Sequence, residues 1–256
     1  ISSSIMSKKL AEGIDALVLD VKFGTGAFMR EKDKARELAK TMVGIGRSFG
    51  KDVVALLTDM NRPLGYAVGN ALEVIESVEI LQGKGPDDVR ELTLALGAEM
   101  LVLGHVAKDL DDAQRQLVAA IDSGAGLRKF EQVTEAQGGD PRALTDWTRL
   151  PTARRTIDVP SPADGFVTRM ETDEIGRAAL LLGAGRTKVD DVVDPAVGLV
   201  LLKKTGDAVR AGEPIATLHV NDERRLAEAT KRLVDAFSIG PAAPAPQPLV
   251  AERITG

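Results

Sequence analysis

Cysteine is absent from this chain of 256 residues, and aromatic side chains and long apolar runs are scarce. The lack of cysteine excludes disulfides, thiolate nucleophiles and cysteine-ligated zinc sites, and it suits the reducing cytoplasm, where we expect the protein. Aromatic residues form only 3% of the sequence, which argues against a base-stacking platform for nucleic acid. Because no stretch approaches the roughly 18 apolar residues of a transmembrane helix, we expect no membrane partner.

The acidic charge balance also argues against a nucleic-acid partner. The sequence has 33 basic and 38 acidic residues, a net charge of -5 and a pI of about 5.3, and its basic residues form no concentrated stripe. Hydrophobic residues make up 44% of the chain. A chain of this length and composition can bury a substantial core, and its length suggests one or two domains.

The first half of the sequence predicts an α/β fold, with a partial mixed or parallel sheet flanked by helices. Residues 17–21 and 52–58 are apolar runs typical of parallel strands that are covered on both faces. Between them, residues 31–49 form a predicted helix that ends at Gly50, so the order strand–helix–strand gives a βαβ unit. Further helices are predicted over residues 3–12, 66–80, 87–103 and 109–123, with stop signals at Gly13 and at 124–126.

Dense turn signals between Gly138 and Pro151 mark a predicted domain boundary. Beyond it, the sequence predicts strands over residues 156–159, 165–170, 198–203 and 214–220, followed by a helix over 224–237. We therefore predict an α/β part over residues 1–150, a smaller α+β domain over 151–240 and an extended tail over 241–256. The turns of the smaller domain are similar to those of barrel-sandwich carrier domains. A carrier role is not expected, because Glu174 stands where such carriers need a lysine.

Two polar side chains near the start of the chain are candidates for binding chemistry. Ser4 and Lys8 stand four residues apart in a helix-compatible stretch, so a hydroxyl and an ammonium share one helix face. An apolar strand and the glycine-containing segment 24–29 follow them. Polar groups beside the carboxyl end of a parallel strand occupy the usual place of ligands in open α/β sheets. Without further context, a serine and a lysine in such a helix are more often solvated surface residues.

The string SSSIMSKKLAEGIDALVLDVKFGTGAFM, residues 2–29, closely resembles the pyrimidine-nucleoside phosphorylases, thymidine phosphorylase included. The likeness continues through TDMNRPLG, residues 58–65, and into the last hundred residues, where Gly183-Ala184-Gly185-Arg186 carries it. The family's Lys-His-Ser-Thr-Gly-Gly phosphate loop and the signature of its small helical domain do not occur in the sequence. The resemblance therefore implies that this is the C-terminal portion of a longer enzyme.

The resemblance implies a glycosyltransferase of nucleoside salvage. The complete enzyme would convert thymidine and phosphate into the free base and a (deoxy)ribose 1-phosphate, with uridine and deoxyuridine as further candidate substrates. The leaving pyrimidine gains negative charge as its bond to the sugar lengthens, so donors aimed at the base lower the barrier. By the resemblance, Ser4 hydrogen-bonds the edge of the base, Lys8 stabilises its charge as the catalytic residue, and Phe28 forms an apolar wall of the pocket. Residues 1–256 alone are expected to be inactive, because the phosphate loop and a base-binding arginine of the family are not among them.

A cation site is implied by the same resemblance. Its ligands in this sequence are the backbone oxygens of Leu64 and Ala67 and the carboxylate of Glu76. Hard oxygen ligands with a single carboxylate suit K⁺, Na⁺ or Ca²⁺ better than zinc. An ordinary surface carboxylate is an equally good interpretation of Glu76. Phosphate is the expected co-substrate, and no organic cofactor is expected.

Several alternatives stay open at this point. Asp20 and Lys22 are interpreted as a structural ion pair, with a supporting role at the site as the lesser alternative. The complete enzyme is expected to be a homodimer that binds a pyrimidine nucleoside and phosphate; no dimer is predicted for residues 1–256, because the family's dimer contacts come largely from its helical domain. A stand-alone module that binds a pyrimidine without turnover is a second hypothesis. A related phosphoribosyltransferase is a third and weaker one, since such enzymes lack the domain that begins near Arg155.

Overall fold

The computed structural model describes residues 1–186 and 188–256, which divide into two compact units. Unit 1 comprises Ile1–Asn61, Asp87–Ala120 and Gln247–Gly256. Unit 2 comprises Arg62–Pro86 and Ile121–Pro246. The division does not follow the predicted ranges 1–150, 151–240 and 241–256, because two segments of the first range, 62–86 and 121–150, belong to unit 2 and the end of the chain belongs to unit 1. As boundaries of evolutionary domains, these ranges stay a prediction.

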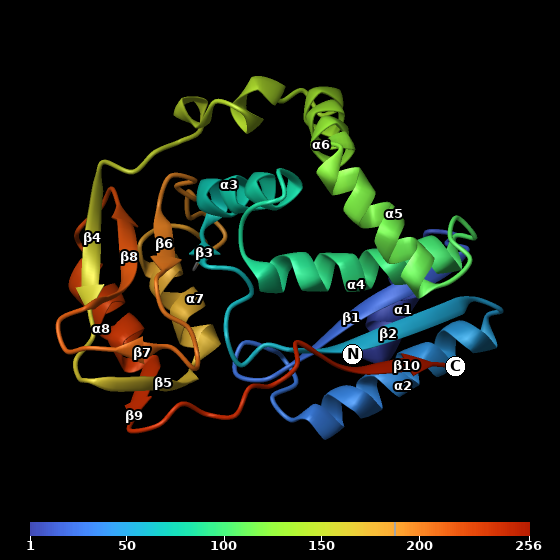
Figure 1. Ribbon diagram of the computed structural model, residues 1–256, viewed down its shortest axis with the longest axis horizontal. Helices are drawn as coiled ribbons and strands as arrows, with labels where there is room; N and C mark the ends of the chain where they lie inside the picture. Colours follow the sequence, from blue (N-terminus) through green and yellow to red (C-terminus); the bar gives the residue numbers. More distant parts are fainter. Residues whose placement is uncertain (187) are drawn as a thin grey trace. The chain divides into compact units, whose positions relative to one another are not determined.

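Unit 1 is built on a three-stranded sheet in the order β1-β2-β10 (Figure 1). The strands are β1 (Ala16–Phe23), β2 (Asp52–Asp59) and β10 (Val250–Thr255). β1 and β2 are parallel and in register from Ala16 opposite Asp52 to Phe23 opposite Asp59, whereas β10 is antiparallel to β2. The predicted α/β layer with a mixed sheet is confirmed.

Helices cover both faces of this sheet. They are α1 (Ser2–Ala11), α2 (Lys32–Ser48), α4 (Asp87–Leu103) and α5 (Leu110–Asp122), whose last two residues belong to unit 2. Alternate residues of β2 point to opposite faces. Val53, Ala55 and Leu57 join the core formed with α1 and α2, while Leu56 faces side chains of α4 and α5. Seven of the eight residues of β2 are buried, as expected for a strand covered on both sides.

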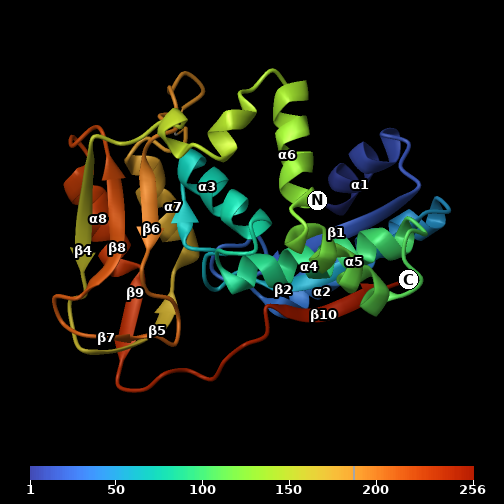
Figure 2. The ribbon, with the colours of Figure 1, turned by 45° about the horizontal axis from the view of Figure 1, so that its top comes forward.

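Unit 2 contains two open antiparallel sheets, and the strands that the structure describes close no barrel. One sheet has the order β3-β6-β8-β4, with β3 (Ala67–Val68), β6 (Gly198–Leu201), β8 (Pro214–Val220) and β4 (Arg155–Pro160). The other has the order β7-β5-β9, with β7 (Ala208–Val209), β5 (Gly165–Met170) and β9 (Phe237–Gly240). Strands β6, β8 and β4 lie side by side in Figures 1 and 2. The predicted smaller α+β region is confirmed.

The helices of unit 2 complete its core. They are α3 (Asn70–Leu81), α6 (Ala125–Ala136), α7 (Thr172–Leu181) and α8 (Leu226–Asp235), with short 3₁₀ turns at Pro141–Leu144 and Trp147–Arg149. Helices α7 and α8 pack against each other, and both contribute to a core that both sheets share. The fully buried side chains of that core include Val159, Met170, Ile175, Leu218 and Leu233.

The structure corrects several predicted elements. The helix predicted over 66–80 begins only at Asn70, because Gly69 has φ 146°, a left-handed backbone conformation that glycine adopts readily and a helix does not contain. The residues just before it form β3. Helices α6 and α7 and strand β9 were not predicted, and the predicted tail contains β10. None of the helices in the described ranges is long and apolar enough to cross a membrane.

Candidate functional site

Helix α1 presents the predicted pair Ser4 and Lys8 to solvent. Met6, 1% exposed, anchors the helix in the core of unit 1 and lies between them in sequence, so both polar side chains point away from the core. Lys9 forms an ion pair with Glu12 at 3.3 Å. The Lys8 ammonium has no ion-pair partner among the residues that the structure describes, which leaves it available to a ligand. Its place in the last turn of the helix is also electrostatically favourable for a cation.

The third predicted binding residue, Phe28, lies on the loop that follows β1 in the same unit. The loop is closed by hydrogen bonds from the Gly24 N–H to the Met29 carbonyl at 3.2 Å and from the Ala27 N–H to the Gly24 carbonyl at 3.1 Å. The Phe28 side chain is 80% exposed. A ring held on a closed loop and open to solvent is available as an apolar wall for a ligand.

The predicted ion pair between Asp20 and Lys22 is confirmed, with Lys22 Nζ 2.7 Å from Asp20 Oδ2. Thr58, fully buried on the neighbouring strand, donates a hydrogen bond to the other oxygen of Asp20, and its hydroxyl accepts one from Lys22 at 3.4 Å. This closed set of contacts ties the carboxyl ends of β1 and β2 together. Since the ends of two parallel strands meet at one edge of the sheet, the Phe28 loop lies at that edge too.

Two residues at the same edge had no role in the sequence-based prediction. Asp59, 5% exposed, ends β2, and its Oδ1 accepts hydrogen bonds from the backbone N–H and the side-chain amide of Asn61 at 3.1 and 2.6 Å. The available signal was local: an Asp two residues before an Asn after a buried strand is typical of an Asx-type turn.

In unit 2, the structure brings together two of the three predicted cation ligands. Glu76 Oε1 accepts hydrogen bonds from the N–H groups of Tyr66 and Ala67 at 2.8 and 3.0 Å, so the carboxylate adjoins the segment whose carbonyls were predicted as ligands. Leu64 lies half-buried upstream on the same segment. The described residues contain no cluster of three or more His, Asp or Glu suited to a metal. Lys204, 8% exposed, places its ammonium 4.4 Å from the Tyr66 ring centroid, so this segment already borders one positive charge.

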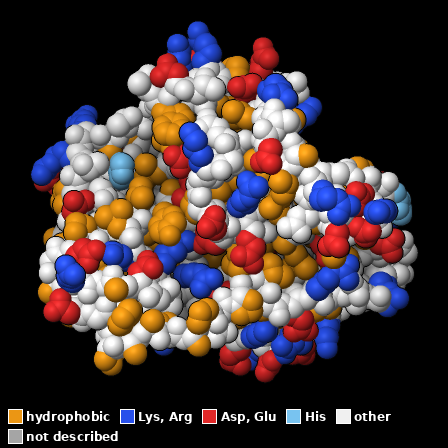
Figure 3. Space-filling view, in the orientation of Figure 1, with side chains coloured by type: hydrophobic (Ala, Val, Ile, Leu, Met, Phe, Trp, Pro, Cys, Tyr) orange, Lys and Arg blue, Asp and Glu red, His pale blue; other side chains and the backbone are white. Residues whose placement is uncertain are grey.

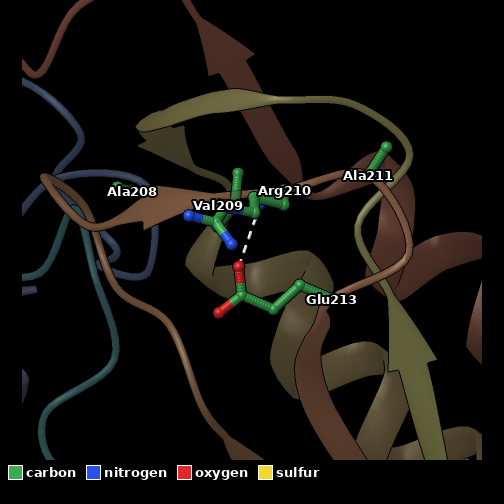
Figure 4. Close-up of a pocket in the computed structure, with 5 residues that line it drawn as sticks. All are labelled: Ala208, Val209, Arg210, Ala211 and Glu213. Carbon is green, nitrogen blue, oxygen red and sulfur yellow. Dashed lines mark hydrogen bonds between the residues drawn. The ribbon is translucent and has the colours of Figure 1, made fainter.

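A surface groove of 610 Å³ in unit 2 contains none of the predicted site residues (Figure 4). It is formed by the turn after β7, where the N–H of Arg210 donates to Glu213 Oε2 at 3.0 Å. A hydrogen bond from Lys203, together with this backbone contact, lowers the pKa of Glu213. The charged groups of the turn thus stabilise one another. On the molecular face in Figure 3, acidic and basic side chains are interspersed with apolar ones.

Comparison with known proteins matches both parts of the chain to domain families. Residues 3–127 match the a/b domain of a glycosyl transferase family, and residues 166–240 match the C-terminal domain of pyrimidine nucleoside phosphorylase. All six predicted site residues lie within the first match. The second match does not support the phosphoribosyltransferase hypothesis, because that class was expected to lack this domain.

Comparison with whole proteins gives the same family as the comparison with domain families. The pyrimidine-nucleoside phosphorylase of Bacillus subtilis (strain 168) is 48% identical over 247 residues, which are 96% of this chain and 57% of that protein. The corresponding proteins of Geobacillus stearothermophilus and Staphylococcus aureus (strain bovine RF122 / ET3-1) are 47% and 46% identical, over 88% and 93% of this chain and 52% and 55% of their own lengths. The chain thus spans about half the length of the curated relatives it matches. With both of its parts matched, the chain belongs to the pyrimidine-nucleoside phosphorylase family.

Proposed function

We propose that the complete protein carrying this chain is a pyrimidine-nucleoside phosphorylase, with thymidine, uridine and deoxyuridine as candidate substrates. The observation that carries the proposal is the pairing of Ser4 and Lys8 on the solvent side of α1. Their helix lies within the match to the glycosyl transferase domain, and the relatives it resembles bear the name pyrimidine-nucleoside phosphorylase.

In the proposed reaction, an oxygen of phosphate forms a bond to C1′ of the sugar while the bond from C1′ to the pyrimidine N1 breaks. The electron pair of the broken bond leaves with the base, which becomes negatively charged on its ring and carbonyl oxygens. The Lys8 ammonium stabilises that charge, an interaction stronger in the transition state than in the bound substrate. The Ser4 hydroxyl hydrogen-bonds the edge of the base, and the Phe28 ring excludes water from one of its faces.

The phosphate-binding part of the reaction involves residues outside this chain. None of residues 1–256 matches the family's phosphate loop, so we expect the 256-residue chain alone to release no free base from thymidine or uridine. A protein of the relatives' full length that carries this sequence should release base and sugar 1-phosphate from at least one of them, and only when phosphate is present. Loss of nucleoside absorbance, with chromatography of the products, measures both. The absence of reaction in the long protein, with every candidate nucleoside, would refute the proposed activity.

The cation and the homodimer are part of the same proposal. Glu76, with the carbonyls of Leu64 and Ala67, would hold K⁺, or in its place Na⁺ or Ca²⁺, on the segment that Glu76 already contacts. Sedimentation of the long protein tests the homodimer.

The absence of the phosphate loop from residues 1–256 favours a second candidate for this chain by itself. It retains Ser4, Lys8 and Phe28, so a pyrimidine-binding module without turnover is the alternative. Binding of uracil or thymine to the 256-residue chain, measured by calorimetry, tests that alternative directly.

A further inference from the structure

The loop that carries Phe28 is attached to the segment that follows β2. The N–H of Thr25 donates to Asn61 Oδ1 at 3.2 Å, and the N–H of Gly26 donates to the Met60 carbonyl at 2.9 Å. Both contacts join residues that are far apart in the sequence, so they fix the loop to the sheet edge and not merely to itself.

The Asn61 side chain is oriented by a buried carboxylate. Its amide nitrogen donates to Asp59 Oδ1 at 2.6 Å, which turns the amide oxygen toward the N–H of Thr25. Asp59 is 5% exposed, and its Oδ1 also accepts a hydrogen bond from the backbone N–H of Asn61. Two hydrogen bonds therefore hold Asn61 to this buried carboxylate. Asn61 itself is exposed, so the core of unit 1 does not depend on its side chain.

Close packing at Gly24 completes the contact. Gly24 has φ 117°, and a Cβ added there would lie 2.7 Å from the backbone nitrogen of Asn61 and 2.8 Å from its side-chain Cγ and Oδ1. A side chain at position 24 would therefore push Asn61 away from the loop. The N–H of Met60 also donates to the Phe23 carbonyl at 2.7 Å, directly before the loop.

We propose that Asn61 is a positioning residue for the base end of the site, acting through Thr25 on the loop that carries Phe28. This inference rests on the proposed function. The exposed Phe28 ring has little packing of its own, so the hydrogen bonds of its loop decide where the ring stands. Asn61 is also the last residue of the first segment of unit 1, and Arg62 begins unit 2. The same contacts therefore hold the chain in place where it leaves unit 1.

The first experiment measures the contact without any need for activity. In the 256-residue chain, Asn61→Ala should raise the hydrogen-exchange rate of the Thr25 amide at least about tenfold, because that amide loses its acceptor. Asp59→Asn retains an acceptor oxygen at the same position and should leave the Thr25 rate close to that of the unsubstituted chain. Asn70→Ala is the matched control: Asn70 is an exposed asparagine in unit 2 whose side-chain amide donates to the Ala184 carbonyl at 2.9 Å, and the loss of that bond should not affect Thr25.

The second experiment measures the consequence in the long protein. An apolar wall contacts the base equally in the bound substrate and in the transition state, so its misplacement raises KM for the nucleoside and changes kcat less. We expect Asn61→Ala to raise that KM about 3- to 10-fold, the equivalent of one hydrogen bond, with KM for phosphate unchanged. Gly24→Ala disturbs the same contact from the loop side and should give the same pattern. Because both variants break one contact, the double variant should be no worse than the more impaired single variant.

Faster Thr25 exchange together with a raised nucleoside KM in both variants supports the proposal. An unchanged exchange rate in Asn61→Ala overturns it, and so does an unchanged nucleoside KM. A fall in kcat with KM unchanged also overturns it, since loss of folded enzyme alone would give that result. Failure of the unsubstituted long protein to cleave any pyrimidine nucleoside would refute the proposed function and this role with it. That failure is distinguishable, because it appears before any substitution is made.

Discussion

Removal of the Arg253 guanidinium should destabilise unit 1 much more than removal of the negative charge of the adjacent Glu252. Arg253 and Glu252 are adjacent on β10 and therefore point to opposite faces of the sheet. Arg253 makes a two-point contact with Glu99 of α4, with Nη2 2.9 Å from Oε2. Glu252 pairs with Arg36 of α2, with an Nε–Oε2 distance of 2.7 Å. The two pairs thus attach the last strand to the helices on both faces.

Burial decides the difference in magnitude. Glu99 is 2% exposed, so Arg253→Met leaves a buried carboxylate without its partner. Loss of one partner from a buried pair costs about 3–5 kcal/mol. The side chain of Arg253 is 45% exposed and the pair lines a cavity of 340 Å³ that water can enter, so we expect about 3 kcal/mol, the lower end. In the pair of Arg36 with Glu252 both side chains are about 30% exposed, and Glu252→Gln should cost about 1 kcal/mol or less.

The assay can separate the two units. Trp147 is the one tryptophan of the chain and belongs to unit 2, so its fluorescence reports the unfolding of that unit. Hydrogen exchange at the amides of β2 and β10 reports unit 1. In a urea titration, Arg253→Met should weaken exchange protection in unit 1 and leave the fluorescence midpoint unchanged.

A double variant tests the cause. Glu99→Met in the Arg253→Met background removes the uncompensated charge and fills the site with apolar atoms, so it should recover most of the lost free energy of unfolding. If Arg253→Met costs no more than Glu252→Gln, or if the double variant is additive, the unpaired carboxylate of Glu99 is not the cause of the destabilisation.

Further predictions concern the site and the pH response. In the long protein, Lys8→Ala should lower kcat/KM by roughly 10²–10³, as loss of one donor to a developing anion does; Ser4→Ala should cost less, on the order of 1–3 kcal/mol of transition-state binding. Steady-state kinetics on thymidine and uridine checks both, and near-normal turnover in Lys8→Ala would contradict the assignment. Glu76→Gln keeps an oxygen for the two N–H groups it accepts but removes the charge, so it should reduce the rise in Tm on adding K⁺ or Ca²⁺; an unchanged cation response would make Glu76 an ordinary surface carboxylate. Burial lowers the pKa of His219, so the unfolded chain binds a proton at this residue more readily than the folded chain, and stability should fall as the pH drops below about 6.5. His219→Gln should show a smaller loss of Tm between pH 7.5 and 5, and an identical loss would refute that cause.

The sequence predicted elements well where the local pattern and the tertiary environment agree. The apolar run 17–21 became the centre of β1, and the helix predicted over 31–49 became α2 (Lys32–Ser48). Gly13 and Gly50, expected as stops, adopt φ 72° and 68° after their helices. Such a helix end can be predicted from the glycine itself, because it depends on the backbone conformation of that residue and not on a contact with a distant part of the chain.

The missed elements have specific physical reasons. Gly124, interpreted as the end of helical structure, has φ 70° and stands just before α6, so one glycine ends one helix and precedes the next. Helix α7 starts with Asp173 and Glu174 in its first turn, a favourable N-terminal charge pattern that the comparison with carrier hairpins obscured. Strand β10 follows a proline-rich segment, and its partner β2 lies about three quarters of the chain's length away, so no local pattern predicts the pairing.

The site shows the same division between local and distant determinants. The spacing of Ser4 and Lys8 predicts that they share one helix face, and their predicted role toward the base comes from the resemblance to the family. The contact of Asn61 with Thr25 spans 36 residues and depends on the register of two parallel strands. A single sequence, compared with its family, predicts candidate residues for binding a base, but it does not predict which side chains hold them in place. Groups that act by positioning are therefore the ones for which the structure is needed, and Asn61 is the residue at which that difference can be measured.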